Sequence, residues 1–153
     1  MIQRPQTLFL LGAAILLFTS TMVPLWQLER LGVVAVDIDA FKMTIGGKSF
    51  STVYLASISI VSSLVALVSI FLYKNRKNQL KLGLLNMVFI LVYALVLVFK
   101  TIPDAGKIVG AAAEKGSYGL GVFMIIGALI LNFLASRFIR KDEELVRSVD
   151  RIR

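Results

Sequence analysis

Carboxylates are the main side chains of this chain that could carry chemistry. The 153 residues include no cysteine and no histidine, so the chain has no thiol nucleophile and lacks the commonest metal ligand and neutral-pH base. Asp37 and Asp39 lie on the same face of a predicted strand and could bind a cation weakly, but solvated charges on a strand face are the simpler interpretation. Other carboxylates at predicted interfaces are Asp104, Glu114, Asp142, Glu143 and Glu144. We therefore expect no enzyme activity, no metal and no cofactor.

Four long apolar runs must position these groups. Each is about long enough, at about 1.5 Å per helical residue, to cross a hydrocarbon core of about 30 Å. We predict spans at residues 8–28, 53–73, 82–99 and 117–136. None of the four contains Asp, Glu, Lys, Arg or His, which argues against an ion-coupled transporter or pump. A cleaved signal peptide is the alternative for the first run, but the run is long and lacks a clear cleavage site.

The basic residues predict the orientation of these spans. The loop at residues 74–81 carries four basic residues between two spans, as cytoplasmic turns do. With the N-terminus and the tail, it holds eleven of the 17 basic residues. We therefore predict a multi-pass protein of the bacterial inner membrane with both termini in the cytoplasm and anionic lipid headgroups as counterions. No aromatic side chains are interleaved with the basic ones, so nucleic-acid binding is not expected.

Residues 33–50 have the period-two alternation of a strand pair. Val34, Val36 and Ile38 alternate with smaller or charged residues, and Gly46 and Gly47 supply a turn. This element is either a lid on the helices or an edge that binds a partner or ligand. The predicted fold class is thus an all-α membrane protein: a four-helix transmembrane bundle with a small extracytoplasmic β-hairpin between helices 1 and 2, forming one domain over residues 1–153.

Small and polar side chains recur along the predicted spans. In lipid, small residues allow helices to approach closely, and polar side chains form hydrogen bonds between helices. We expect these positions to be packing seams, with a ligand cavity in the bundle as the alternative. The candidate residues are Ser59, Ser63, Asn86, Tyr93 and Asn132.

The tail at residues 137–153 combines dense charge with one apolar face. Leu145, Val149 and Ile152 are spaced i, i+4 and i+7, which favours an amphipathic helix. We predict a cytoplasmic tail helix that lies on the surface or docks on a partner, with a plain charged anchor as the alternative. The candidate contact surface comprises Arg140, Lys141, Asp142, Glu143, Leu145, Arg147, Asp150 and Arg151.

Both ends of the chain carry motifs, MIQR-x-QT at residues 1–7 and RKDEELVRS-x-DRIR at residues 140–153. With the four apolar runs, they resemble an uncharacterised Bacteroidota family of small four-span membrane proteins, domain of unknown function 4293. The resemblance implies a topology but no activity. We therefore predict a non-enzymatic accessory or scaffold subunit that binds other membrane protein subunits. The alternative is a protein that binds or transports a lipid or small molecule through a cavity in the bundle.

Overall fold

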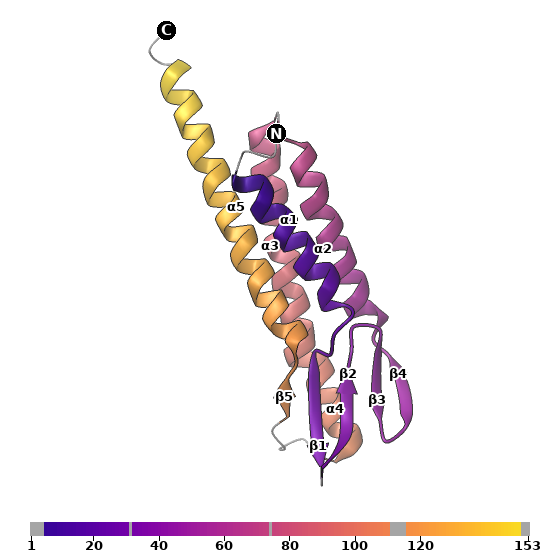
Figure 1. The fold of residues 1–153 in the computed structure, drawn as a ribbon. Coiled ribbons are helices and arrows are strands. Elements are labelled where there is room, and N and C mark those ends of the chain that lie inside the picture. Colours follow the sequence, from indigo (N-terminus) through magenta and orange to yellow (C-terminus); the bar gives the residue numbers. More distant parts are fainter. Residues whose placement is uncertain (1–4, 31, 74, 111–115, 151–153) are drawn as a thin grey trace.

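A computed structural model describes residues 5–30, 32–73, 75–110 and 116–150. Helices dominate, and short strands occupy the connections between them (Figure 1). The elements in chain order are α1 (Pro5–Ser20), β1 (Trp26–Arg30), β2 (Val33–Ile38), β3 (Lys42–Ile45), β4 (Lys48–Ser51), α2 (Val53–Phe71), α3 (Arg76–Val96), the π-helical turn η1 (Leu97–Thr101), α4 (Ile102–Val109), β5 (Ser117–Tyr118) and α5 (Leu120–Asp150).

The long helices α1, α2, α3 and α5 pack side by side, α1 against α2 and α5, and α3 against the same two (Figure 1). Small residues line these contacts: Ala13, Ala66 and Ala128 are fully buried. A Cβ added at Gly83 of α3 would lie 2.8 Å from Ser136 Oγ of α5. The helices therefore approach one another at small residues, as is common in lipid.

Three helical segments are long and apolar enough to cross a membrane, namely Val53–Phe71, Arg76–Val109 and Leu120–Leu145. The helix α1 is also apolar, but its 16 residues extend only about 24 Å. Large apolar side chains also cover the outer faces, with Phe71 and Phe123 more than 60% exposed. Because soluble proteins rarely expose apolar surface so continuously, these helices indicate a membrane protein.

The predicted fold class, an all-α protein with a small hairpin, is wrong. The described residues form a five-stranded antiparallel sheet in the order β4-β3-β2-β1-β5. Two of its strands include residues that the sequence assigned to membrane spans: the first three residues of β1 belong to the predicted first span, and both residues of β5 belong to the predicted fourth. Trp26 of β1 pairs with Ile38 of β2 on one side and with Tyr118 of β5 on the other. The fold is therefore a mixed one, of helices joined to a sheet.

The early end of α1 explains the extra strand. Thr19, Ser20 and Thr21 donate side-chain hydrogen bonds to main-chain carbonyls three or four residues back. Pro24 follows and has no N–H for a helical bond. The helix ends at Ser20, and the alternating residues from Trp26 onward form β1 with Trp26 and Leu28 buried.

The sheet lies at one end of the long helices, next to α4 (Figure 1). Its buried face includes Leu28, Val36 and Met43, which belong to the same apolar core as Leu55 of α2 and Leu97. Main-chain bonds join the layers, because Ala56 N–H donates to Ala40 O over 3.2 Å. At the opposite end lie the start of α1, the turn between α2 and α3, and the end of α5 (Figure 1).

The helical segment that begins at Arg76 continues to Val109 through the π-helical turn η1. Ile102 N–H bonds to Leu97 O, five residues back, and Pro103 follows at the start of α4. A π turn relieves the clash that proline causes inside an α-helix. The helix therefore extends ten residues beyond the predicted end of the third span at residue 99.

Candidate functional site

A chain of buried hydrogen bonds joins three helices at their centre. Ser62 Oγ of α2 donates to Asn86 Oδ1 of α3 over 2.6 Å. Asn86 Nδ2 then donates to Asn132 Oδ1 of α5 over 3.2 Å, and Asn132 Nδ2 donates to Gly83 O over 2.8 Å. The three polar side chains are at most 1% exposed. Two of the predicted polar residues, Asn86 and Asn132, are thus brought together as a link between helices.

Ser59 and Ser63 join α2 to α1. Ser59 Oγ donates to Leu17 O over 2.7 Å, and Ser63 Oγ donates to Ala14 O over 3.0 Å. Both hydroxyls bond to backbone carbonyls of the neighbouring helix, as serine does in helix seams. The sequence did not single out Ser62, although it stands beside Ser63 in the same polar stripe.

Tyr93 is the exception among the predicted polar residues. It is fully buried, and its hydroxyl has no hydrogen-bond partner of good geometry. The hydroxyls of Ser20 and Ser59 are nearby. Tyr93 lies two turns of α3 from Asn86, about 10 Å along the axis, so the five predicted residues do not converge on one site.

A second group of buried polar atoms lies near the end of the helices that carries the α2–α3 turn. Gln79 Nε2 donates to Ser69 O over 3.1 Å, but Gln79 Oε1 and Ser69 Oγ have no partner. Gln6 Nε2 of α1 is also buried without a partner. The sequence did not single out these three residues, because Gln6 and Gln79 lie two positions from basic residues in the polar segments outside the predicted spans.

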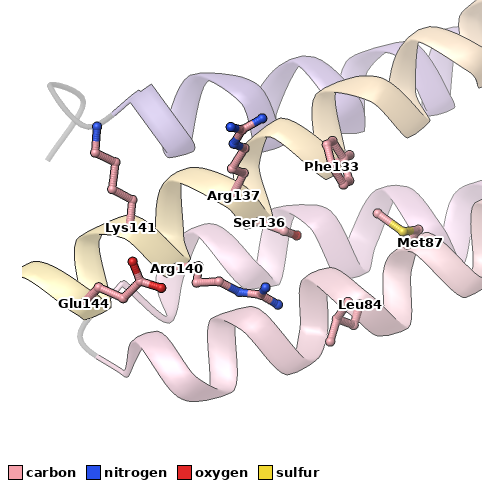
Figure 2. Close-up of a pocket in the computed structure, with 8 residues that line it drawn as sticks. All are labelled: Leu84, Met87, Phe133, Ser136, Arg137, Arg140, Lys141 and Glu144. Atoms are coloured by element: carbon pink, nitrogen blue, oxygen red, sulfur yellow. The ribbon is translucent and has the colours of Figure 1, made fainter.

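A groove lies between α3 and α5 at the same end and has a volume of about 690 Å³. Its lining comprises Leu84, Met87, Phe133, Ser136, Arg137, Arg140, Lys141 and Glu144. Figure 2 shows the guanidinium of Arg140 extending from α5 over the strip between the two helices, toward Leu84. Two residues of the predicted contact surface, Arg140 and Lys141, thus line a groove.

The rest of that predicted surface is divided. Asp142 binds the start of α3: Arg76 Nη1 donates to Asp142 O over 3.2 Å, and Arg76 Nη2 lies 3.8 Å from Asp142 Oδ2. Glu143 is half-buried, whereas Leu145 is 58% exposed. Arg147 and Asp150 belong to α5, but their side chains lie outside the described part of the chain, as does Arg151 altogether.

Asp37, Asp39 and Asp104, which the sequence placed at predicted interfaces, lie in the described part of the chain. Asp37 Oδ1 accepts a hydrogen bond from Gln27 Nε2 over 3.1 Å. Burial, and then the charge of Asp37, raise the pKa of Asp39 above its ordinary value, while Lys42 lowers it. Asp104 pairs with Lys107 over 3.2 Å, and Glu114 lies outside the described residues. Within the described ranges, no three acidic residues gather as metal ligands would.

Comparison with curated proteins found no match, and comparison with solved structures found none either. One family model does match, over residues 2–152, which is almost the whole chain. The chain therefore belongs to the uncharacterised family described as Domain of unknown function (DUF4293).

Proposed function

We propose that this chain is a four-span protein of the bacterial inner membrane, in a member of the Bacteroidota. In this proposal it acts without catalysis, as an accessory or scaffold subunit of a membrane complex. Both termini are cytoplasmic, and the end of α5 binds another subunit. The polar interior supports a non-catalytic role, because Asn86, Asn132, Ser59 and Ser63 all bond to neighbouring helices.

The fourth span in this proposal is α1 with the residues that follow it. Leu8, Ile15 and Phe18 project at least 49% exposed from α1, as lipid-facing side chains do. The helix lies along α2 and α5, which are both long enough to span. Residues 21–25 connect α1 to the sheet. In this proposal they supply the length that the 16-residue helix lacks for crossing the core.

The proposed orientation is supported by the basic end of the molecule. The α2–α3 turn and the last turns of α5 lie at that end, joined by the contact of Arg76 with Asp142. Basic residues favour the cytoplasmic side of a bilayer. The sheet at the other end is then extracytoplasmic.

The observation that carries the proposed role is the length of α5. Its 31 residues extend about 46 Å, which exceeds a hydrocarbon core of about 30 Å by about 16 Å. The last turns extend beyond the other helices (Figure 1). Leu145 is exposed there, next to Glu144, which is also exposed. A projecting helix of this kind is a suitable docking element for a partner helix or groove.

The test is crosslinking in native membranes followed by purification of the tagged chain. A variant that lacks residues 146–153 should lose a stoichiometric partner, while Lys77→Gln, which changes one exposed charge at the same end, should keep it. If the shortened chain captures the same partner, or if the intact chain remains a monomer in gentle detergent, the proposed role is wrong.

The alternative role, binding or transport through a cavity among Ser59, Ser63, Asn86, Tyr93 and Asn132, has weaker support. Four of these side chains use their hydrogen-bonding groups on neighbouring helices. Tyr93 alone retains an unpaired buried hydroxyl. A substrate path would need these polar groups to face a shared open space.

A further inference from the structure

We propose that the groove between α3 and α5 binds one anionic glycerophospholipid of the surrounding leaflet. The phosphate would lie at Arg140, with the flexible side chains of Arg137 and Lys141 turning toward it from the other side of α5, where Figure 2 shows their ends, and an acyl chain would lie over Leu84, Met87 and Phe133. This inference rests on the membrane location proposed above, and it does not depend on the protein partner.

The groove lies at the depth where a headgroup meets the acyl chains. Residues 120–136 of α5 contain no charged residue and extend about 26 Å, close to the thickness of a hydrocarbon core. When Leu120 lies at one boundary of the hydrocarbon core, Arg137 therefore lies at the other. From Phe133 to Lys141 the axial distance is about 12 Å, so the groove crosses from the acyl region into the headgroup region.

The cations at the groove are available for an anionic ligand. Among the residues that the structure describes, Arg137, Arg140 and Lys141 form no ion pair. Glu144 is the one acidic residue in the lining, so the lining keeps an excess of positive charge. Arg76 differs, because Asp142 accepts its hydrogen bond. Unpaired arginine side chains bind phosphate well, since each guanidinium can donate two parallel hydrogen bonds.

The other half of the groove suits hydrocarbon. Leu84 and Phe133 are 51% and 54% exposed, and Met87 adds a flexible apolar side chain. The volume of about 690 Å³ is within the range of small-molecule sites. A free phosphate ion would leave this apolar half without a partner, so a lipid fits the whole groove better.

A second groove provides an internal comparison. It lies between α1 and α2, has a volume of about 330 Å³, and is lined by residues such as Ile15, Ile60 and Leu64. No charged side chain lines it. The α1–α2 groove can accept acyl chains but has no charged group to distinguish one headgroup from another. Of the two grooves, only the α3–α5 groove is therefore expected to select anionic lipids.

The test is native mass spectrometry of the full chain, purified in detergent and titrated separately with phosphatidylglycerol and phosphatidylcholine. The wild type should retain one phosphatidylglycerol in preference to phosphatidylcholine. In Arg137→Gln/Arg140→Gln, retention of phosphatidylglycerol should fall roughly 25-fold, or about fivefold for each cation near an anionic lipid. The matched control Lys77→Gln/Lys81→Gln removes the same charge from exposed positions of α3 outside the groove, and it should retain the lipid as the wild type does.

A third variant tests the apolar half. Leu84→Trp fills that half without changing charge, and it should also lower phosphatidylglycerol retention, with helicity measured by circular dichroism to verify folding. Equal retention of the two lipids by the wild type, or equal losses in both double variants, would overturn the proposal and indicate general surface attraction. The chain that lacks residues 146–153 should still retain the lipid, so loss of the partner and loss of the lipid are separate results.

Discussion

Asn132 links α5 to α3, and Asn132→Ala should destabilise the protein by about 1–3 kcal/mol. The substitution removes the bonds from Asn86 Nδ2 and to Gly83 O. Interhelical hydrogen bonds in membranes contribute about 0.6 kcal/mol each, so the two bonds account for roughly 1.2 kcal/mol. The buried Asn86 amide, left without its acceptor, adds a desolvation cost of the order of 1 kcal/mol or more.

The assay is reversible unfolding in mixed detergent micelles, followed by circular dichroism, on a double-mutant cycle of Asn86→Ala and Asn132→Ala. The coupling energy should be about 0.6–1.7 kcal/mol. Ser57→Ala is the control, because the exposed Ser57 hydroxyl bonds only within α2, and its effect should stay within about 0.5 kcal/mol. Additivity of the two asparagine variants within about 0.3 kcal/mol would refute the link.

Three further substitutions test other parts of the fold. Gly116→Ala should lower the midpoint of thermal unfolding and quench or shift Trp26 fluorescence, because the added Cβ would lie 2.1 Å from Trp26 Cζ2. An unchanged emission spectrum would contradict the packing of β1 against β5. Tyr93→Phe should leave stability unchanged or raise it by about 1 kcal/mol, because it removes a buried hydroxyl without a partner. A clear loss of stability in micelle unfolding would show that the hydroxyl is hydrogen-bonded. The pKa of Asp39 is raised in the fold, so the folded state binds the proton more tightly than the unfolded state, and stability falls as the pH rises from the ordinary pKa through the raised pKa. Asp39→Asn should abolish this fall in thermal midpoints measured from pH 4 to 7. Identical pH profiles for the variant and the wild type would contradict this prediction.

The sequence predicted the helices best where apolar runs were long and free of proline. The residues of α2 were predicted almost to their ends, at residues 53–73 against Val53–Phe71. Errors arose where apolar character continued after the helix had ended. Trp26 and Leu28 are as apolar as helix residues, but they are buried by β2 and by the core beneath the sheet.

The strand β5 could not be predicted from local pattern at all. It has two residues, Ser117 and Tyr118, and exists because they pair with Gln27 and Trp26, about 90 positions earlier in the chain. Its approach depends on Gly116 and Gly119, where any Cβ would clash with Trp26 or with Pro24 O. Such pairings depend on tertiary contacts, which override local propensity.

The candidate site shows the same division between local and long-range information. The polar residues of the spans were predicted as seams, and Asn86 and Asn132 do meet. By contrast, the groove combines Arg140 of the tail with Leu84 of another span. Only the packing of α3 against α5 brings these residues together, so the tail sequence indicated a charged surface but not its apolar neighbour.

The proposed topology places the sheet and the α2–α3 turn on opposite sides of a bilayer. Because the chain has no cysteine, single cysteines can report this directly with a membrane-impermeant maleimide on spheroplasts. Ser49→Cys in the exposed strand β4 should be labelled in intact spheroplasts, whereas Lys77→Cys and Glu144→Cys should be labelled only after the membrane is opened. Labelling of positions 49 and 77 from the same side of the intact membrane would rule out this topology.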